Sequence, residues 1–279
     1  MLILWSSQAQ GMTPDSAKIL LVRANKMELL SVRTAKLQTM IVLLSKEIGK
    51  ERSVEYHQKE LKADIKEFKS HIAFFKERIP QFGSPGHEFS LVQNLWTIYE
   101  KKFKQIPTDE VLVDVLEGHA QMLDACKTFR HKLGKYCLEQ PGIATKYKHI
   151  SNIAKLSFEA NVSSQRFAYI CLVSHVIQGR KISGIDDTRA AYVAKTKEDI
   201  YNRLEYGVST IGNDGEASDL EMRFRGLQKY HLSLMEKLKN ESSSATFNTE
   251  EVHYAVQKME TRIEELFVEI EVLSKSNEQ

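Results

Sequence analysis

The chain has 279 residues, 42% of them hydrophobic and 27% charged, which is enough to bury two cores of ordinary domain size. Its 39 basic and 37 acidic side chains nearly cancel and are interspersed, which argues against nucleic acid or an anionic membrane surface as a partner. No apolar run reaches the roughly 18 residues needed to span a bilayer, so we expect no stable membrane insertion of the mature chain.

The first ten residues have the character of the end of a secretory signal. Residues 2–5 form an apolar stub, and Ser7 and Ala9 occupy the two small-residue positions before a cleavage site. The basic region and most of the apolar core of such a signal are missing. We therefore expect a truncated signal peptide and a periplasmic mature protein. The alternative is a frayed cytoplasmic N-terminus.

Four helices are predicted in the first half of the chain. Thr13, Pro14 and Asp15 provide a capping hydroxyl, a proline for the first helical position and an acid for the first turn. Thr108 is expected to cap the fourth helix in the same way. Apolar residues recur in steps of three and four along the second and fourth segments, as in helices that bury one stripe. The expected helices span about 13–48, 54–79, 88–105 and 109–136, separated by breaks at 49–53, 80–87 and Pro107.

The second half repeats this plan after a break at Pro141 and Gly142. Residues 95–99 (LWTIY) precede 108–111 (TDEV), and residues 226–230 (GLQKY) precede a similar TEEV. The shared order predicts an internal duplication with Trp96 and Leu227 in equivalent core positions. The expected fold is all-α, with two tandem up-down four-helix bundles at 12–140 and 145–275. The second bundle's helices are predicted at about 145–178, 186–211, 220–238 and 252–273.

Motifs for catalysis or metal binding are missing from the sequence. It contains no HExxH, P-loop, GxGxxG or GxSxG pattern, and its cysteines, Cys126, Cys137 and Cys171, have no CxxC spacing and are expected to be free buried thiols. His119 and His231 lie on apolar stripes, which favours hydrogen-bonded core histidines over ligands. We therefore predict no catalytic residue, no metal site and no cofactor.

The most informative polar residues lie on the first helix of each half. Arg33 and Arg166 both occur among apolar residues, where a guanidinium must either pair with an acid or present its forked donors to an anion. Gln38 and Gln165 place amide donors beside them. The sequence leaves both readings open, an internal ion pair and an anion site.

These segments resemble a known family, the N-terminal sensory domain of type IV pili methyl-accepting chemotaxis transducers (PilJ-type), which is related to the input domain of nitrate/nitrite sensor kinases. The family's first-helix motif reads approximately INxAGRQRMLSQR. Residues 162–167 (VSSQRF) are similar to its AGRQRM portion, and residues 35–40 (AKLQTM) stand in the same place in the first half. Residues 95–99 resemble its third-helix LWxxY, and residues 123–127 (LDACK) resemble its fourth-helix pattern.

The resemblance implies a periplasmic sensory protein with a ligand site on the first helix. Leu37 and Thr39 stand where the family has arginines, so the implied anion contact rests on Arg166 with Gln165 beside it. In the first half, the implied candidates are Arg33, Lys36 and Gln38.

We expect a protein without catalytic activity that binds a small anion such as nitrate or nitrite and signals through a protein partner. That partner would be a sensor kinase, a chemoreceptor or a transporter component. The alternative is a structural helical adaptor with no small-molecule ligand, in which the arginines form internal salt bridges.

Overall fold

The computed structural model describes residues 12–79, 85–106 and 108–140, together with scattered positions between 158 and 173 and between 248 and 261. The described part contains no strand, so the predicted all-helical class is confirmed there. The helices predicted for the second half fall almost wholly outside the described residues, as do the N-terminal segment, Leu227 and His231. The four helices are α1 (Pro14–Leu44), α2 (Glu51–Arg78), α3 (Pro85–Phe103) and α4 (Asp109–Leu138).

Helix α1 begins as predicted and ends earlier than predicted. The Thr13 hydroxyl accepts a hydrogen bond from the Ser16 backbone N–H at 3.2 Å, and Pro14 takes the first helical position. The helix ends at Leu44 instead of continuing to about Ile48. Ile48 is fully exposed, so no packing supports another turn, and Gly49 follows with a φ of 80°.

The other helices begin or end within a few residues of their predicted boundaries. Helix α2 begins at Glu51, inside the predicted break, with its acid in the first turn. Helix α3 begins at Pro85, ahead of the predicted Glu88, because the fixed φ of proline suits a first helical position, and it ends at Phe103, before Gln105. The Thr108 cap of α4 is confirmed by its hydroxyl, which accepts the Val111 N–H at 3.4 Å.

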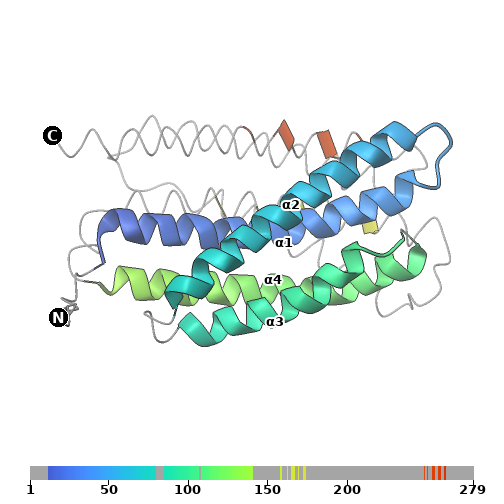
Figure 1. Ribbon diagram of the computed structural model, residues 1–279. Coiled ribbons are helices and arrows are strands. Elements are labelled where there is room, and N and C mark those ends of the chain that lie inside the picture. The colour runs from blue at the N-terminus through green and yellow to red at the C-terminus, as the bar shows by residue number, and fades with distance from the viewer. Residues whose placement is uncertain are drawn as a thin grey trace, which may run out of the picture.

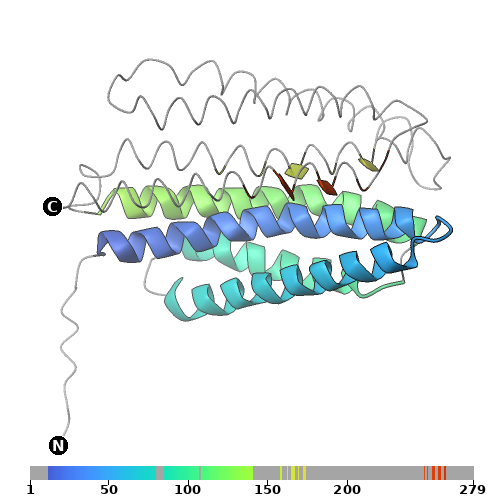
Figure 2. The same ribbon diagram turned by 90° about the horizontal axis from the view of Figure 1, so that it is seen from above.

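The helices run lengthwise beside one another, with α1 in the middle (Figures 1 and 2). Helix α1 packs against α2 on one side and α4 on another, while α3 packs mainly on α4. From residue 27 to residue 44 every side chain of α1 except Arg33 is buried. A helix that is buried on all faces must have neighbours all round. Phe158 and Val162 from the second half supply one of these contacts, against Leu29 and Val32.

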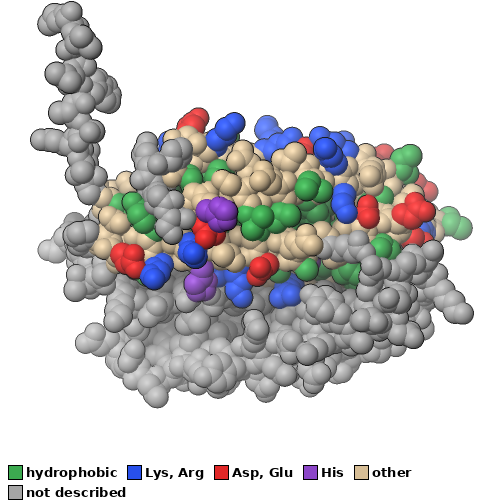
Figure 3. Space-filling view, turned by 90° about the horizontal axis from the view of Figure 1, so that it is seen from below, with side chains coloured by type: hydrophobic (Ala, Val, Ile, Leu, Met, Phe, Trp, Pro, Cys, Tyr) green, Lys and Arg blue, Asp and Glu red, His purple; other side chains and the backbone are tan. Residues whose placement is uncertain are grey.

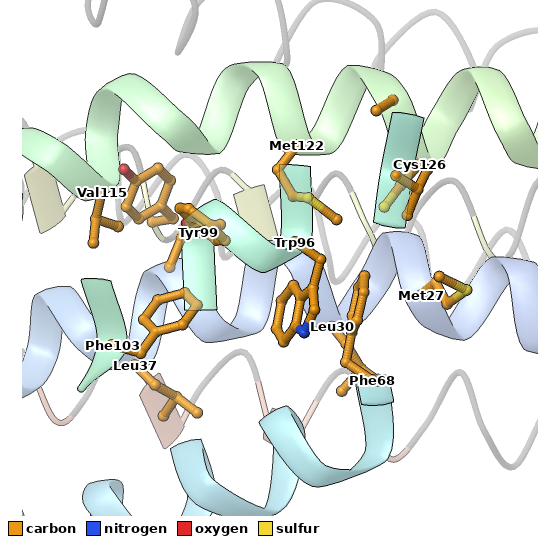
Figure 4. Packing of buried hydrophobic residues seen from close by; sticks show 14 of the residues in the cluster. Met27, Leu30, Leu37, Phe68, Trp96, Tyr99, Phe103, Val115, Met122 and Cys126 are labelled. Atoms are coloured by element: carbon orange, nitrogen blue, oxygen red, sulfur yellow. The ribbon is translucent and has the colours of Figure 1, made fainter. Parts of the chain in front are cut away.

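Aromatic rings fill the centre of the core (Figure 4). Phe68 of α2 stacks on Trp96 of α3, with ring centroids 3.8 Å apart. The same hydrophobic cluster includes Tyr169, Leu172 and Val173, so described residues of the second half share one core with the first. The division into units at 12–140 and 145–275, and the two-fold relation between them, remain predictions.

The described surface carries charges of both signs. Figure 3 shows acidic and basic side chains scattered over one face without a large patch of either sign. None of the described helices has a stretch apolar and long enough to cross a lipid bilayer. Cys126 and Cys137 are free and buried, as predicted, and burial raises the pKa of both thiols. Cys171 lies outside the described residues.

Candidate functional site

Two of the predicted site residues, one from each half of the chain, meet inside the bundle. The Lys36 ammonium donates a hydrogen bond to Oε1 of Gln165 at 2.6 Å, across 129 residues of sequence. Lys36 is only 1% exposed and Gln165 is fully buried. Gln38 is also buried, but it lies two positions beyond Lys36 and so faces another side of α1. A buried ammonium is costly unless polar partners surround it, so this pair marks a polar centre within the core.

Arg33 has an acidic partner. Its Nε lies 3.1 Å from Oδ2 of Asp64, which joins α1 to α2 through a largely buried ion pair. For this residue the geometry matches the ion-pair reading of the sequence. Arg33 is the one side chain between residues 27 and 44 that is only partly buried, and Asp64 pairs with its charge.

Arg166 lies close to a buried histidine, which in turn contacts a tyrosine. Burial, followed by the positive charge of Arg166, lowers the pKa of His119 to about 3, although contact with the Ser31 backbone opposes the shift. The His119 ring meets the Tyr169 ring edge-on, with centroids 4.6 Å apart. Burial, together with the proximity of Tyr169, raises the pKa of Tyr99. His119 is thus a neutral imidazole at physiological pH.

Several polar atoms in this region lack hydrogen bonds. Among the described residues, the Tyr99 hydroxyl and both ring nitrogens of His119 have no well-aligned partner. The expectation that His119 would be a core histidine is confirmed, and the Ser31 backbone is its hydrogen-bonding neighbour, although neither ring nitrogen is well aligned with it. Buried polar groups without partners are rare in folded proteins and call for a water, an ion or a ligand.

The two groups of residues lie next to each other along one helical face. Gln165 and Tyr169 are four residues apart on the described helical positions of the second half, so they share a face. The Lys36 contact therefore lies one helical turn from the His119 contact. An ammonium, an amide, a guanidinium and phenol groups are donors suited to an anion. We refer to this set as the polar centre: Lys36, Tyr99, His119, Gln165, Arg166 and Tyr169.

The depressed pKa of His119 makes stability depend on pH. The unfolded chain binds a proton near pH 6.5 and the folded protein does not until about pH 3, so stability is full above pH 6.5 and falls as the pH drops. Chemical denaturation between pH 7 and 5 should show this loss, at up to about 1.4 kcal/mol per pH unit. His119→Gln should reduce the slope by the contribution of His119, while that of His253, whose pKa burial also lowers, remains; His87→Gln, at an exposed histidine, should leave the slope unchanged. An unaltered slope in His119→Gln would contradict the assignment.

A second polar cluster, outside the predicted site, joins α2 to described positions near the C-terminus. His57 Nδ1 lies 2.9 Å from Oε2 of Glu60, and His253 Nε2 lies 3.4 Å from the same oxygen. Gln257 donates to the other carboxylate oxygen at 2.9 Å. Beside this cluster, Glu250 accepts hydrogen bonds from the Lys50 ammonium and the Ser53 hydroxyl.

Sequence reasoning missed this cluster for a simple reason. His57 and Glu60 are three residues apart on one helix face, which was a visible signal, but the third member is nearly 200 residues away.

Comparison of the chain with protein-family models, with curated proteins and with solved structures gives no match.

Proposed function

We propose that the protein is a non-catalytic ligand-binding helical bundle of sensory type that takes a small anion, such as nitrate or nitrite, at the polar centre. The mature protein would act in the periplasm and pass the occupancy of the site to a protein partner. A sensor kinase, a chemoreceptor or a transporter component would fit that role, as the PilJ-type resemblance of residues 162–167 implies.

The observation that carries this proposal is the convergence of predicted and unpredicted donors. Lys36, Gln165 and the neighbouring Arg166 were candidates from sequence, and they lie near a tyrosine hydroxyl and an imidazole that have no well-aligned hydrogen bond among the described residues. An oxyanion accepts hydrogen bonds through every oxygen, so one small ligand can satisfy several of these donors at once. The low interior dielectric strengthens each such bond.

A thermal-unfolding titration tests the proposal. Nitrate, nitrite, chloride and sulfate should be compared at constant ionic strength, so that general salt effects cancel. A ligand at 100 times its dissociation constant stabilises the folded state by about 2.7 kcal/mol, and we expect this from nitrate or nitrite. Absence of any anion-specific rise in the unfolding temperature would refute the anion site.

Arg166→Lys should weaken the response although it keeps the charge. A guanidinium gives a planar oxyanion two parallel hydrogen bonds, and an ammonium cannot reproduce that geometry. Arg52→Lys, at an exposed position of α2, is the matched control and should titrate like the wild type. Equal responses from all three proteins would remove Arg166 from the site.

The structural adaptor is the second candidate, and specific ion pairs favour it. Arg33 pairs with Asp64, and Arg130 of α4 pairs with Glu28 of α1, so internal acids pair with one partly exposed and one buried guanidinium group. An adaptor requires such pairs and no ligand. It predicts an unfolding temperature that is insensitive to the identity of the anion.

A further inference from the structure

The cluster at α2 has the composition and geometry of a metal-binding site. One nitrogen from each of His57 and His253 and one carboxylate oxygen of Glu60 lie within 4.8 Å of one another. Nitrogen and oxygen ligands lie about 2.0–2.2 Å from Zn²⁺, so two of them at tetrahedral or octahedral angles are separated by about 3.0–3.5 Å. The measured separations from Glu60 Oε2 are 2.9 Å to His57 and 3.4 Å to His253.

We propose that His57, Glu60 and His253 bind a divalent first-row transition ion that prefers nitrogen ligands, of which Zn²⁺ is the natural probe. Two imidazoles and one carboxylate leave coordination positions for water or an exogenous ligand, as in open three-ligand sites. Hard ions such as Mg²⁺ and Ca²⁺ prefer oxygen ligands throughout and should not compete.

The surroundings orient the carboxylate toward the two rings. Gln257 donates to Oε1 of Glu60, which leaves Oε2 facing both histidines, as an outer-shell partner does for a metal ligand. Both histidines are buried, and His253 has no well-aligned hydrogen-bond partner at either nitrogen within the described chain. Its ring is therefore held in the core with Nε2 beside Glu60 and Nδ1 without a hydrogen bond among the described residues.

The charges around the site nearly cancel, which limits the kind of ion that it can bind. Lys36 is close enough to lower the pKa of His253, so its ammonium works against a dication, while Glu60 offsets one positive charge. Glu250 adds a carboxylate near His57, but Lys50 neutralises it. Net electrostatic attraction is weak, and binding must come from coordination by nitrogen. This favours Zn²⁺ and its neighbours in the transition series over ions held mainly by charge.

Zinc titration of the full chain tests the proposal. The protein should be prepared without a polyhistidine tag, stripped with a chelator, and titrated with Zn²⁺ by calorimetry, with Mg²⁺ as the ion control. We expect one Zn²⁺ per chain. His253→Gln and Glu60→Gln each remove a direct ligand and should weaken binding by more than the roughly 10- to 100-fold that loss of an outer-shell partner costs. His87→Gln, at an exposed histidine, should bind like the wild type.

Two further measurements separate a metal site from a hydrogen-bonded cluster. Gln257→Ala leaves all three ligands in place and should weaken Zn²⁺ binding by about 10- to 100-fold, with a helical circular dichroism spectrum equal to that of the wild type. Co²⁺ should give visible absorption bands that His253→Gln lacks. The proposal is overturned if the stripped wild type binds no Zn²⁺, or if the ligand variants bind it unchanged.

This inference is independent of the anion site. None of the three ligands belongs to the polar centre, although Lys36 of that centre acts electrostatically on His253, so the anion and zinc titrations test different side chains and either can fail alone.

Discussion

Trp96→Ala is expected to lower the free energy of unfolding by about 3–5 kcal/mol, as measured by chemical denaturation followed by circular dichroism. Trp96 is 3% exposed, and its ring stacks on Phe68 of α2 at an interplanar angle of 15°. It also meets Tyr99 and Phe103 on its own helix. Truncation removes the ring's transfer free energy and leaves a cavity at the point where α2 and α3 approach each other (Figure 4).

The matched control is Ile98→Ala. Ile98 lies two residues further along α3 and is 60% exposed, so its truncation should change the free energy by no more than about 0.5 kcal/mol. If Trp96→Ala cost as little as the control, the stacked core between α2 and α3 would be wrong.

Arg130→Met is expected to cost about 3–5 kcal/mol, because it leaves the Glu28 carboxylate buried without this partner. The two side chains join α4 to α1 through Nε of Arg130 and Oε2 of Glu28, and both are nearly inaccessible to solvent. The guanidinium also lies over the Phe158 ring, 5.4 Å from its centroid. The substitution therefore removes one buried charge and takes this ion-pair partner from the other.

The double variant Glu28→Leu/Arg130→Met should recover most of that loss. Removing both charges also removes the desolvation penalty, and apolar replacements of similar volume are often neutral or stabilising. Lys135→Met is the control, since its pair with Glu139 is exposed and contributes little. A double variant as unstable as Arg130→Met alone would mean that the pair itself holds α1 to α4.

The helix count and caps of the first half were predictable because their causes are local. Threonine caps at Thr13 and Thr108 depend on a hydroxyl and the next turn of backbone, and both are confirmed. The end of α1 was not predictable from periodicity, because Ile48 is apolar and would continue a stripe. Only its lack of a packing partner shows why the helix stops at Leu44. Pro85 was read as part of a loop, although proline also favours the first turn of a helix.

The candidate sites were only partly predictable, because their contacts join distant parts of the chain. Lys36 and Gln165 were identified separately as polar residues on apolar helices, but nothing in the sequence paired them. The acid that accepts the Arg33 ion pair, Asp64, was unforeseen because an exposed acid and a buried one have the same residue type. His253 was missed for a similar reason, since a lone histidine acquires ligand geometry only through its neighbours in space.

The central position of α1 has a consequence for biosynthesis. Lys50 and Glu250 are in contact but 200 residues apart in the sequence. Because translation adds roughly 5–20 residues per second, Lys50 is synthesised about 10–40 s before Glu250. Leu29 and Val32 are likewise uncovered until Phe158 and Val162 have been made. The nascent chain therefore carries an open apolar helix face while translation continues. The resulting risk of aggregation is kinetic, and it persists however stable the finished fold becomes.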